Sequence, residues 1–147
     1  MAVSDDDVQF VQRAFESFNA TQGEREDEAG ILAHFERWYH PDVEIVNADD
    51  WPLPASYRGT EGYVRWYREN YGAYEDVRYA VNFLGAVGDR VVALVTISGR
   101  PRGEDTELVV EIGLVYRMRE GRIGSVELYL GHERPMRVAQ ATVSERA

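Results

Sequence analysis

The sequence predicts a single α+β domain in which helices precede a curved antiparallel sheet. Three segments with apolar residues at helical spacing fill the first half of the chain, with one short strand between the second and third. Four β-rich segments, joined by turn dipeptides, fill the second half. Helices grouped before strands are typical of α+β architecture. A chain of 147 residues is long enough for one good core, so we expect one domain over residues 1–147.

The first two helices have clear start or stop signals. Ser4 can cap a helix whose first turn holds three aspartates, which suit the positive end of the helix dipole. The apolar face of this helix is then Val8, Val11, Phe15 and Phe18. A second helix is predicted over 26–39, ending before Pro41 because the residue that precedes a proline avoids helical dihedrals.

The remaining elements are predicted from the spacing of apolar residues, which changes between strand-like alternation and helical spacing. Residues 43–47 alternate as a strand, a proline-rich loop follows, and Gly59 opens a third helix with tyrosines at three- and four-residue spacing. Strands are predicted over 77–87, 91–98, 107–118 and 123–130, joined by turns such as Glu120-Gly121. The segment 135–147 is predicted to be a loosely packed tail.

Composition excludes several classes of function. The net charge is −10, and this acidic balance disfavours nucleic acids and anionic membranes as partners. There is no cysteine, so thiolate metal sites and cysteine nucleophiles are excluded. The N-terminus has no secretory pattern and no apolar run approaches a membrane span, which predicts a cytoplasmic protein. The three histidines have no metal-ligand spacing, so we expect no metal and no cofactor.

Four phrases, in order, resemble the SnoaL-like and ketosteroid isomerase-like branches of the nuclear transport factor 2-like (NTF2-like) superfamily. They begin at Val11-Gln-Arg, Pro41-Asp-Val-Glu-Ile-Val, Tyr57-Arg-Gly-Thr-Glu-Gly and Tyr116-Arg-Met-Arg-Glu-Gly. The resemblance implies a cone-shaped sheet, with the three helices packed on its concave side around an apolar cavity. It also implies a homodimer, which we expect to form through the outer face of the sheet.

The chemistry of characterised relatives does not carry over. In ketosteroid isomerases the position of the aspartate base falls on Asn47, and the oxyanion tyrosine and aspartate fall on Ala14 and Leu114. Two supporting tyrosines correspond to Tyr39 and Tyr67. Limonene epoxide hydrolases share the Asn47 amide, but four other polar positions are aliphatic here: Ile45, Val95, Ile97 and Leu128.

The candidate polar site lies at the end of the first strand. Asn47 is predicted to orient a ligand, although asparagine also favours turns. Asp50, beside Trp51, is the preferred general base and Asp49 the second candidate; both also suit an exposed acidic loop. Predicted ligand-binding residues, which equally suit a plain core, are Phe15, Phe18, Trp38, Tyr39, Trp51, Tyr57, Trp66, Tyr67, Leu114, Tyr116 and Leu128.

Two functions therefore remain open. One is a cofactor-independent isomerase, cyclase or dehydratase that transfers protons on an apolar or polycyclic small molecule. The other is a non-catalytic ligand-binding or dimerisation module. Strand alternation places Glu111 on the outer face, whereas the faces of Glu127 and Tyr129 depend on a one-residue register.

Overall fold

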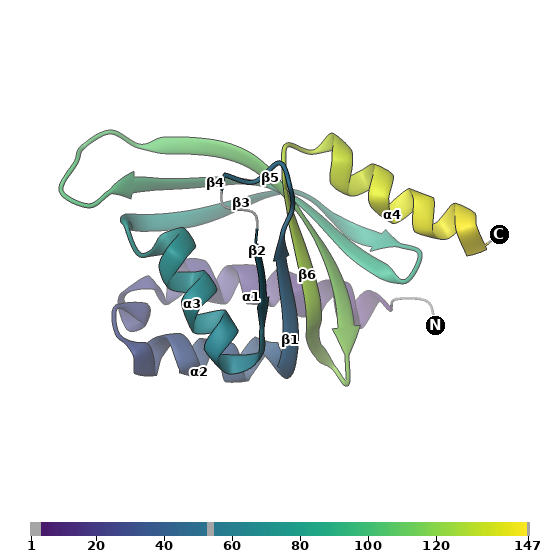
Figure 1. The fold of residues 1–147 in the computed structure, drawn as a ribbon, viewed down its shortest axis with the longest axis horizontal. Coiled ribbons are helices and arrows are strands. Elements are labelled where there is room, and N and C mark those ends of the chain that lie inside the picture. Colours follow the sequence, from purple (N-terminus) through teal and green to yellow (C-terminus); the bar gives the residue numbers. More distant parts are fainter. Residues whose placement is uncertain (1–3, 53–54, 147) are drawn as a thin grey trace.

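The computed structural model describes residues 4–52 and 55–146, with side-chain surroundings as far as residue 140. Apart from β2 and α4, the helices and strands follow one another in the predicted order, and the described residues form four α-helices around one six-stranded sheet (Figure 1). The helices are α1 (Asp5–Ala20), the short 3-10 helix η1 (Gln22–Arg25), α2 (Glu28–Trp38), α3 (Gly59–Tyr71) and α4 (Glu133–Arg146). The strands are β1 (Tyr39–Asn47), β2 (Ala55–Arg58), β3 (Tyr74–Val87), β4 (Arg90–Pro101), β5 (Leu108–Arg119) and β6 (Arg122–Leu130).

The predicted helix starts are largely confirmed. Ser4 accepts a hydrogen bond from the backbone of Asp7, and the Asp7 carboxylate accepts one from the backbone of Ser4, which is a capping box. Helix α2 begins two residues later than predicted, because the Asp27 side chain caps it by accepting from Gly30 N. Strand β1 starts directly after α2, so residue 39, which was predicted as helix, and residues 40–42, which were predicted as neither helix nor strand, belong to β1.

One pairing departs from the predicted antiparallel sheet. The strand order is β2-β1-β6-β5-β4-β3, and β1 runs parallel to β6 while all other neighbours are antiparallel. The reason is β2, which was predicted as loop. Because β2 turns back and pairs with one edge of β1, the later strands can join β1 only at its other edge. The sheet is therefore mixed, curved and unclosed.

The helices form two unequal layers. Helices α1, α2 and α3 gather on one side of the sheet and α4 lies on the other (Figure 1). Ile112, Leu114 and Leu128 face the three helices in the main core, whereas Val115 and Tyr129 face α4. The pairing of Leu114 with Leu128 confirms Leu128 as an inner residue and places Glu127 and Tyr129 outside.

The C-terminal segment is a helix rather than a loosely packed tail. In the described part of α4, Ala139 is fully buried and Pro135 is buried against β5. A Cβ built on Gly113 would lie 2.2 Å from Pro135 Cγ, so only glycine lets the helix approach so closely. The sequence analysis missed this helix because the contact that holds it joins distant parts of the chain.

Candidate functional site

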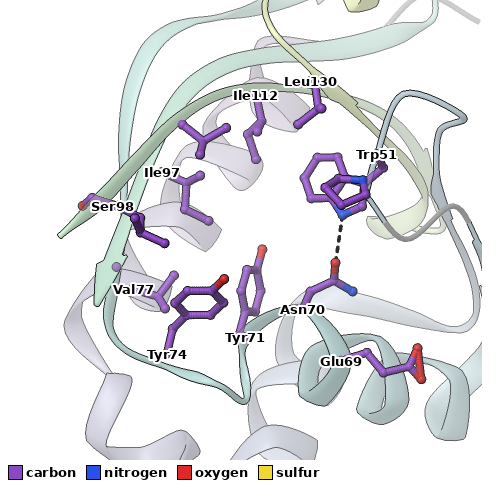
Figure 2. Close-up of a pocket in the computed structure, with 14 residues that line it drawn as sticks. Trp51, Glu69, Asn70, Tyr71, Tyr74, Val77, Ile97, Ser98, Ile112 and Leu130 are labelled. Carbon is purple, nitrogen blue, oxygen red and sulfur yellow. Dashed lines mark hydrogen bonds between the residues drawn. The ribbon is translucent and has the colours of Figure 1, made fainter. Parts of the chain in front are cut away.

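The main cavity lies at the mouth of the cone, between the end of α3, the loop after β1 and the β4–β5 hairpin. It has a volume of about 280 Å³ and is open to solvent. Figure 2 shows Trp51 facing Ile97 across the space, with Tyr71 and Tyr74 below them. The lining is mainly aliphatic and aromatic: Trp51, Pro52, Glu69, Asn70, Tyr71, Tyr74, Val77, Ile97, Ser98, Gly99, Leu108, Val110, Ile112 and Leu130.

A hydrogen-bonded chain of two amides and two indoles fixes one wall of this pocket. Trp66 Nε1 donates to Asn47 Oδ1 at 3.1 Å, and Asn47 Nδ2 donates to Asn70 Oδ1 at 3.3 Å. Asn70 Oδ1 also accepts from Trp51 Nε1 at 3.0 Å, and Asn70 Nδ2 donates to Trp66 O at 2.8 Å. The Asn47 side chain is therefore engaged in positioning Trp51 through Asn70, and it lies behind the pocket wall.

The other polar groups at the pocket are mostly occupied. Glu69 accepts a hydrogen bond from the Tyr57 hydroxyl at 2.8 Å, and its carboxylate points away from the pocket centre in Figure 2. The hydroxyls of Tyr71 and Tyr79 bind each other. Within the described residues, the Tyr74 hydroxyl has no side-chain hydrogen bond, so it can serve a ligand as donor or acceptor.

The interior of the cone is nearly filled by side chains. Its cavity measures about 30 Å³, which is close to the volume of one water molecule. Burial raises the pKa of Tyr39 and Tyr116, so these phenols stay protonated. Burial, helped by Arg25 and Arg37, lowers the pKa of His34 to about 3. The cavity lining is Ala14, Phe15, Phe18, His34, Tyr39, Tyr63, Trp66, Tyr79, Leu114, Tyr116, Ile123 and Val126.

Arg25 is a buried cation that the sequence analysis did not single out. Its guanidinium donates to Phe18 O at 2.6 Å and to Thr21 Oγ1 at 2.5 Å, at the carboxyl end of α1. It also lies 4.0 Å from the centre of the Phe18 ring. The negative end of the helix dipole explains why a buried arginine is tolerated here. Arg25 Nε donates to the Tyr67 hydroxyl at 3.1 Å and so fixes that phenol.

The two candidate carboxylates point away from the pocket. Asp49 is exposed and binds Arg134 of α4, and this hydrogen bond lowers the pKa of Asp49. Asp50 lies 3.6 Å from the same guanidinium and accepts from Leu130 N at 3.4 Å. Neither residue lines either cavity. The structure therefore does not bring Asp49 or Asp50 together with Asn47 over a shared space.

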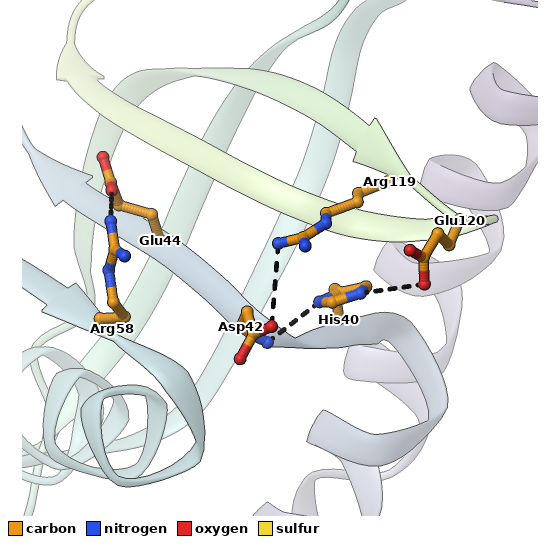
Figure 3. A network of polar contacts seen from close by, with 6 residues as sticks. All are labelled: His40, Asp42, Glu44, Arg58, Arg119 and Glu120. Carbon is orange, nitrogen blue, oxygen red and sulfur yellow. Dashed lines mark hydrogen bonds and ion pairs between the residues drawn. The ribbon is translucent and has the colours of Figure 1, made fainter.

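His40 belongs to a polar network at the other end of β1 (Figure 3). Its Nδ1 accepts from Asp42 N at 3.0 Å, and its Nε2 lies 3.3 Å from the Glu120 carboxylate. Asp42 in turn lies 3.9 Å from Arg119. These contacts tie the start of β1 to the β5–β6 turn. No group of three or more potential metal ligands occurs in the described part of the chain.

The predicted ligand-binding residues divide into three groups. Trp51 lines the mouth pocket, whereas Phe15, Phe18, Tyr39, Trp66, Leu114 and Tyr116 line the small interior cavity. Trp38, Tyr57, Tyr67 and Leu128 line neither and serve as core or supporting residues. Some residues that line the mouth pocket were not predicted to bind a ligand: Asn70, Tyr74, Val77, Leu108 and Val110. Tyr74 is the last of the tyrosines that follow Gly59 at three- and four-residue spacing.

The comparisons with known proteins agree with this architecture. A family model described as a SnoaL-like domain matches residues 11–126. The chain belongs to the SnoaL-like family. No curated protein matches it significantly in sequence. No helix among the described residues is long and apolar enough to cross a membrane.

Several solved structures share the fold. An NTF2-like protein of unknown function from Burkholderia pseudomallei is 21% identical, with a TM-score of 0.66 over 92% of this chain and 98% of that one. A putative SnoaL-like polyketide cyclase from Jannaschia is 14% identical, with a TM-score of 0.66 over 96% and 98%. TerC, co-crystallised with polyporic acid, is 19% identical, with a TM-score of 0.65 over 95% and 98%. At these identities the likeness establishes the NTF2-like fold alone.

Proposed function

We propose that this SnoaL-like protein binds an apolar, flat small molecule in the mouth pocket. The observation that carries the proposal is the open cavity of about 280 Å³, walled by Trp51 on one side and by Ile97 and Val110 on the other. An apolar pocket with few polar groups is the usual form of a small-molecule site. The Tyr74 hydroxyl is placed to hydrogen-bond a single polar group of the ligand.

Trp51 is the proposed stacking surface. Its indole is held by the hydrogen bond from Nε1 to Asn70, so little side-chain freedom is lost when a ring packs against it. The similar structure of TerC was co-crystallised with polyporic acid, which makes that compound a sensible first probe. A pocket of this size would bury only part of a large polycyclic molecule.

The test begins with native mass spectrometry of the purified protein, followed by calorimetric titration of any co-purified compound and of polyporic acid. We expect Trp51→Ala to weaken binding by about tenfold or more, because stacking area and its positioning are lost together. Tyr74→Phe should weaken it less. Phe83→Ala, at an exposed apolar residue that does not line the pocket, is the matched control. Equal affinities for Trp51→Ala and Phe83→Ala would refute the proposal.

Proton-transfer catalysis is the second candidate. Its support is family membership, together with the similar structure described as a putative polyketide cyclase. The general base proposed from the sequence is Asp50, with Asp49 as the alternative and Asn47 as the orienting group. The contacts of both carboxylates with Arg134 give this arrangement no support. If Asp50→Asn and Asp49→Asn both leave turnover of a confirmed substrate intact, neither carboxylate is the base.

We also propose that two copies associate through the outer face of the sheet. Helix α4 covers the part of that face around Val115 and Tyr129 and also contacts β3 and β4, so the interface would use the part of the face that α4 leaves uncovered. Sedimentation velocity tests this proposal directly. A monomer at high concentration would contradict it.

A further inference from the structure

The exposed strand edges of the sheet differ in how well they are protected from pairing with another strand. Strand β3 is an edge strand, and side chains from α1 and η1 cover part of its backbone, at Val77 and Tyr79. Asn19 binds both the carbonyl and the amide of Tyr79, each at 2.9 Å, and Gln22 donates to Val77 O. Irregular pairing interrupts the same strand at two places. Strand β2, the other edge, has four residues. These are the usual means of blunting an edge against unwanted strand pairing.

The first residues of β5 form a third edge, which has no such cover. Pairing with β6 ends at Ile112 and Leu130, and Gly131 N then donates to the Glu111 carbonyl at 2.8 Å as the chain leaves for α4. Residues 108–110 therefore pair with β4 on one side, and no strand among the described residues lies on the other. Alternate residues of a strand direct their backbone groups to the same side, so Val109 presents its amide and carbonyl at this edge.

The uncovered edge is also unusually apolar. Leu108, Val109 and Val110 are 45%, 58% and 43% exposed, and together with Phe83 they are the exposed large hydrophobic residues of the described chain. Leu108 and Val110 face the mouth pocket, while Val109 faces outward. Apolar surface on both faces of an open strand is an aggregation hazard in a monomer, and in native proteins it marks an interaction site.

Acidic side chains surround this edge. Glu104, Asp105 and Glu107 are exposed along the approach to β5, and Glu111 lies at its end, 3.3 Å from His132. A second copy of the chain fits this pattern poorly. Two-fold antiparallel pairing about Val109 would set Glu107 of one copy opposite Glu111 of the other, and like charges directly opposite each other destabilise a sheet.

We propose that the edge of β5 at Leu108–Val110 binds an extended peptide segment of alternating apolar and basic residues. The segment adds a strand to the sheet through the free backbone groups of Val109. Its apolar side chains cover the exposed valines and leucine, and its basic side chains meet Glu107 and the neighbouring acids. This site adjoins the mouth pocket, because Leu108 and Val110 also line that pocket. Val109 and Glu107 do not line it, so variants at these two residues test the peptide site separately from the small-molecule proposal.

The test measures binding of a fluorescent peptide of alternating arginine and valine to the chain of residues 1–147 by fluorescence polarisation. Amide chemical shifts should change at Leu108–Glu111. We expect Val109→Lys to weaken binding by about tenfold or more, through lost apolar contact and charge repulsion. Val109→Pro should act similarly because it removes the amide that faces the edge. Glu107→Gln should weaken binding less and should lower the salt dependence of binding, because one charge that attracts the basic peptide is lost.

Phe83→Lys is the matched control, since it changes an exposed apolar residue on β3 and should leave peptide affinity unchanged. Circular dichroism checks that each variant is folded. Three results would overturn the proposal: no binding by the wild-type chain, equal affinity for a glutamate–valine peptide, or a dimer in sedimentation that Val109→Lys abolishes. The last result would assign the edge to a second copy.

Discussion

The interior of the cone and its mouth are both lined by aromatic and aliphatic side chains, yet they leave very different spaces. The interior cavity measures about 30 Å³ and the mouth pocket about 280 Å³. In the interior, the rings of Phe15 and Phe18 pack against Tyr79 and the ring of Phe35 packs against Tyr63. At the mouth, Trp51 stands apart from the facing strands (Figure 2). The same residue types therefore act as a core in one region and as a binding surface in the other.

The two cavities differ in size because different numbers of helices and strands surround them. In the interior, side chains converge from three helices and from the central strands, and they fill the available volume. At the mouth, the β4–β5 hairpin extends beyond the helices, so the facing surface is limited to the end of α3 and the loop after β1 (Figure 1). Aromatic composition alone does not distinguish a filled cone from an empty one.

The largest expected effect separates the two regions through their tryptophans. Trp66 is 5% exposed and packs against Tyr63 and Tyr71, so Trp66→Ala should lower the free energy of unfolding by about 3–5 kcal/mol. Trp51→Ala removes a half-buried ring and one hydrogen bond and should cost about 1 kcal/mol. Urea unfolding followed by circular dichroism measures both. A larger loss of unfolding free energy in Trp51→Ala than in Trp66→Ala would contradict the distinction between core and binding surface.

The second prediction concerns acid stability and His34. Burial lowers the pKa of His34 to about 3 from an ordinary value of 6.5. In the unfolded chain His34 binds a proton below about pH 6.5, whereas in the folded chain it binds one only near pH 3. The free energy of unfolding should therefore fall as pH drops through this window, by at most about 1.4 kcal/mol per pH unit from this residue.

His34→Phe keeps the ring volume and removes the titration, so its stability should fall less steeply than that of the wild type between pH 6 and 4. His132, which is partly exposed beside Glu111, supplies the matched control as His132→Gln. Chemical unfolding at a series of pH values gives the comparison. Parallel curves for His34→Phe and the wild type would show that the interior does not hold this histidine neutral.

The smallest effect is expected at the outer acids. Asp49 is exposed and its partner Arg134 is partly exposed, and surface ion pairs of this kind contribute little. Asp49→Asn should leave both stability and pocket binding close to the wild type. Arg134→Gln should cost more, because it removes contacts with Asp49 and Asp50 and with the ring of Tyr129. A large loss of ligand binding in Asp49→Asn would indicate that this carboxylate belongs to the binding site.

Local signals in the sequence account for most of the fold. The Ser4 cap, the stop at Pro41, the third helix and the four later strands were all predicted, and the antiparallel pairings followed from their turns. Strand β2 and helix α4 were missed. Helix α4 is positioned by a contact with another element, Pro135 packing on Gly113 of β5. Strand β2 pairs with the neighbouring β1, but it follows a proline-rich segment that predicted a loop.

The site was predicted less completely than the fold. Trp51, which was predicted to bind a ligand, lines the mouth pocket, and Asn47 contacts it through Asn70. The directions of Asp49 and Asp50 depend on Arg134, a residue more than 80 positions away that no local pattern links to them. The β5 wall of the pocket, from Leu108 to Ile112, lies 57 to 61 positions after Trp51 along the chain.

The sequence by itself determined which residues are apolar and where most of the main elements lie, because those properties rest on local periodicity and turn chemistry. The resemblance of four sequence phrases indicated the family. The tertiary structure alone decided which aromatic residues fill the interior and which line a pocket. It also decided that the acids face α4 and that one strand edge stays open. Packing volume and register depend on contacts between distant segments, and a one-residue shift in either reverses the face on which a side chain lies.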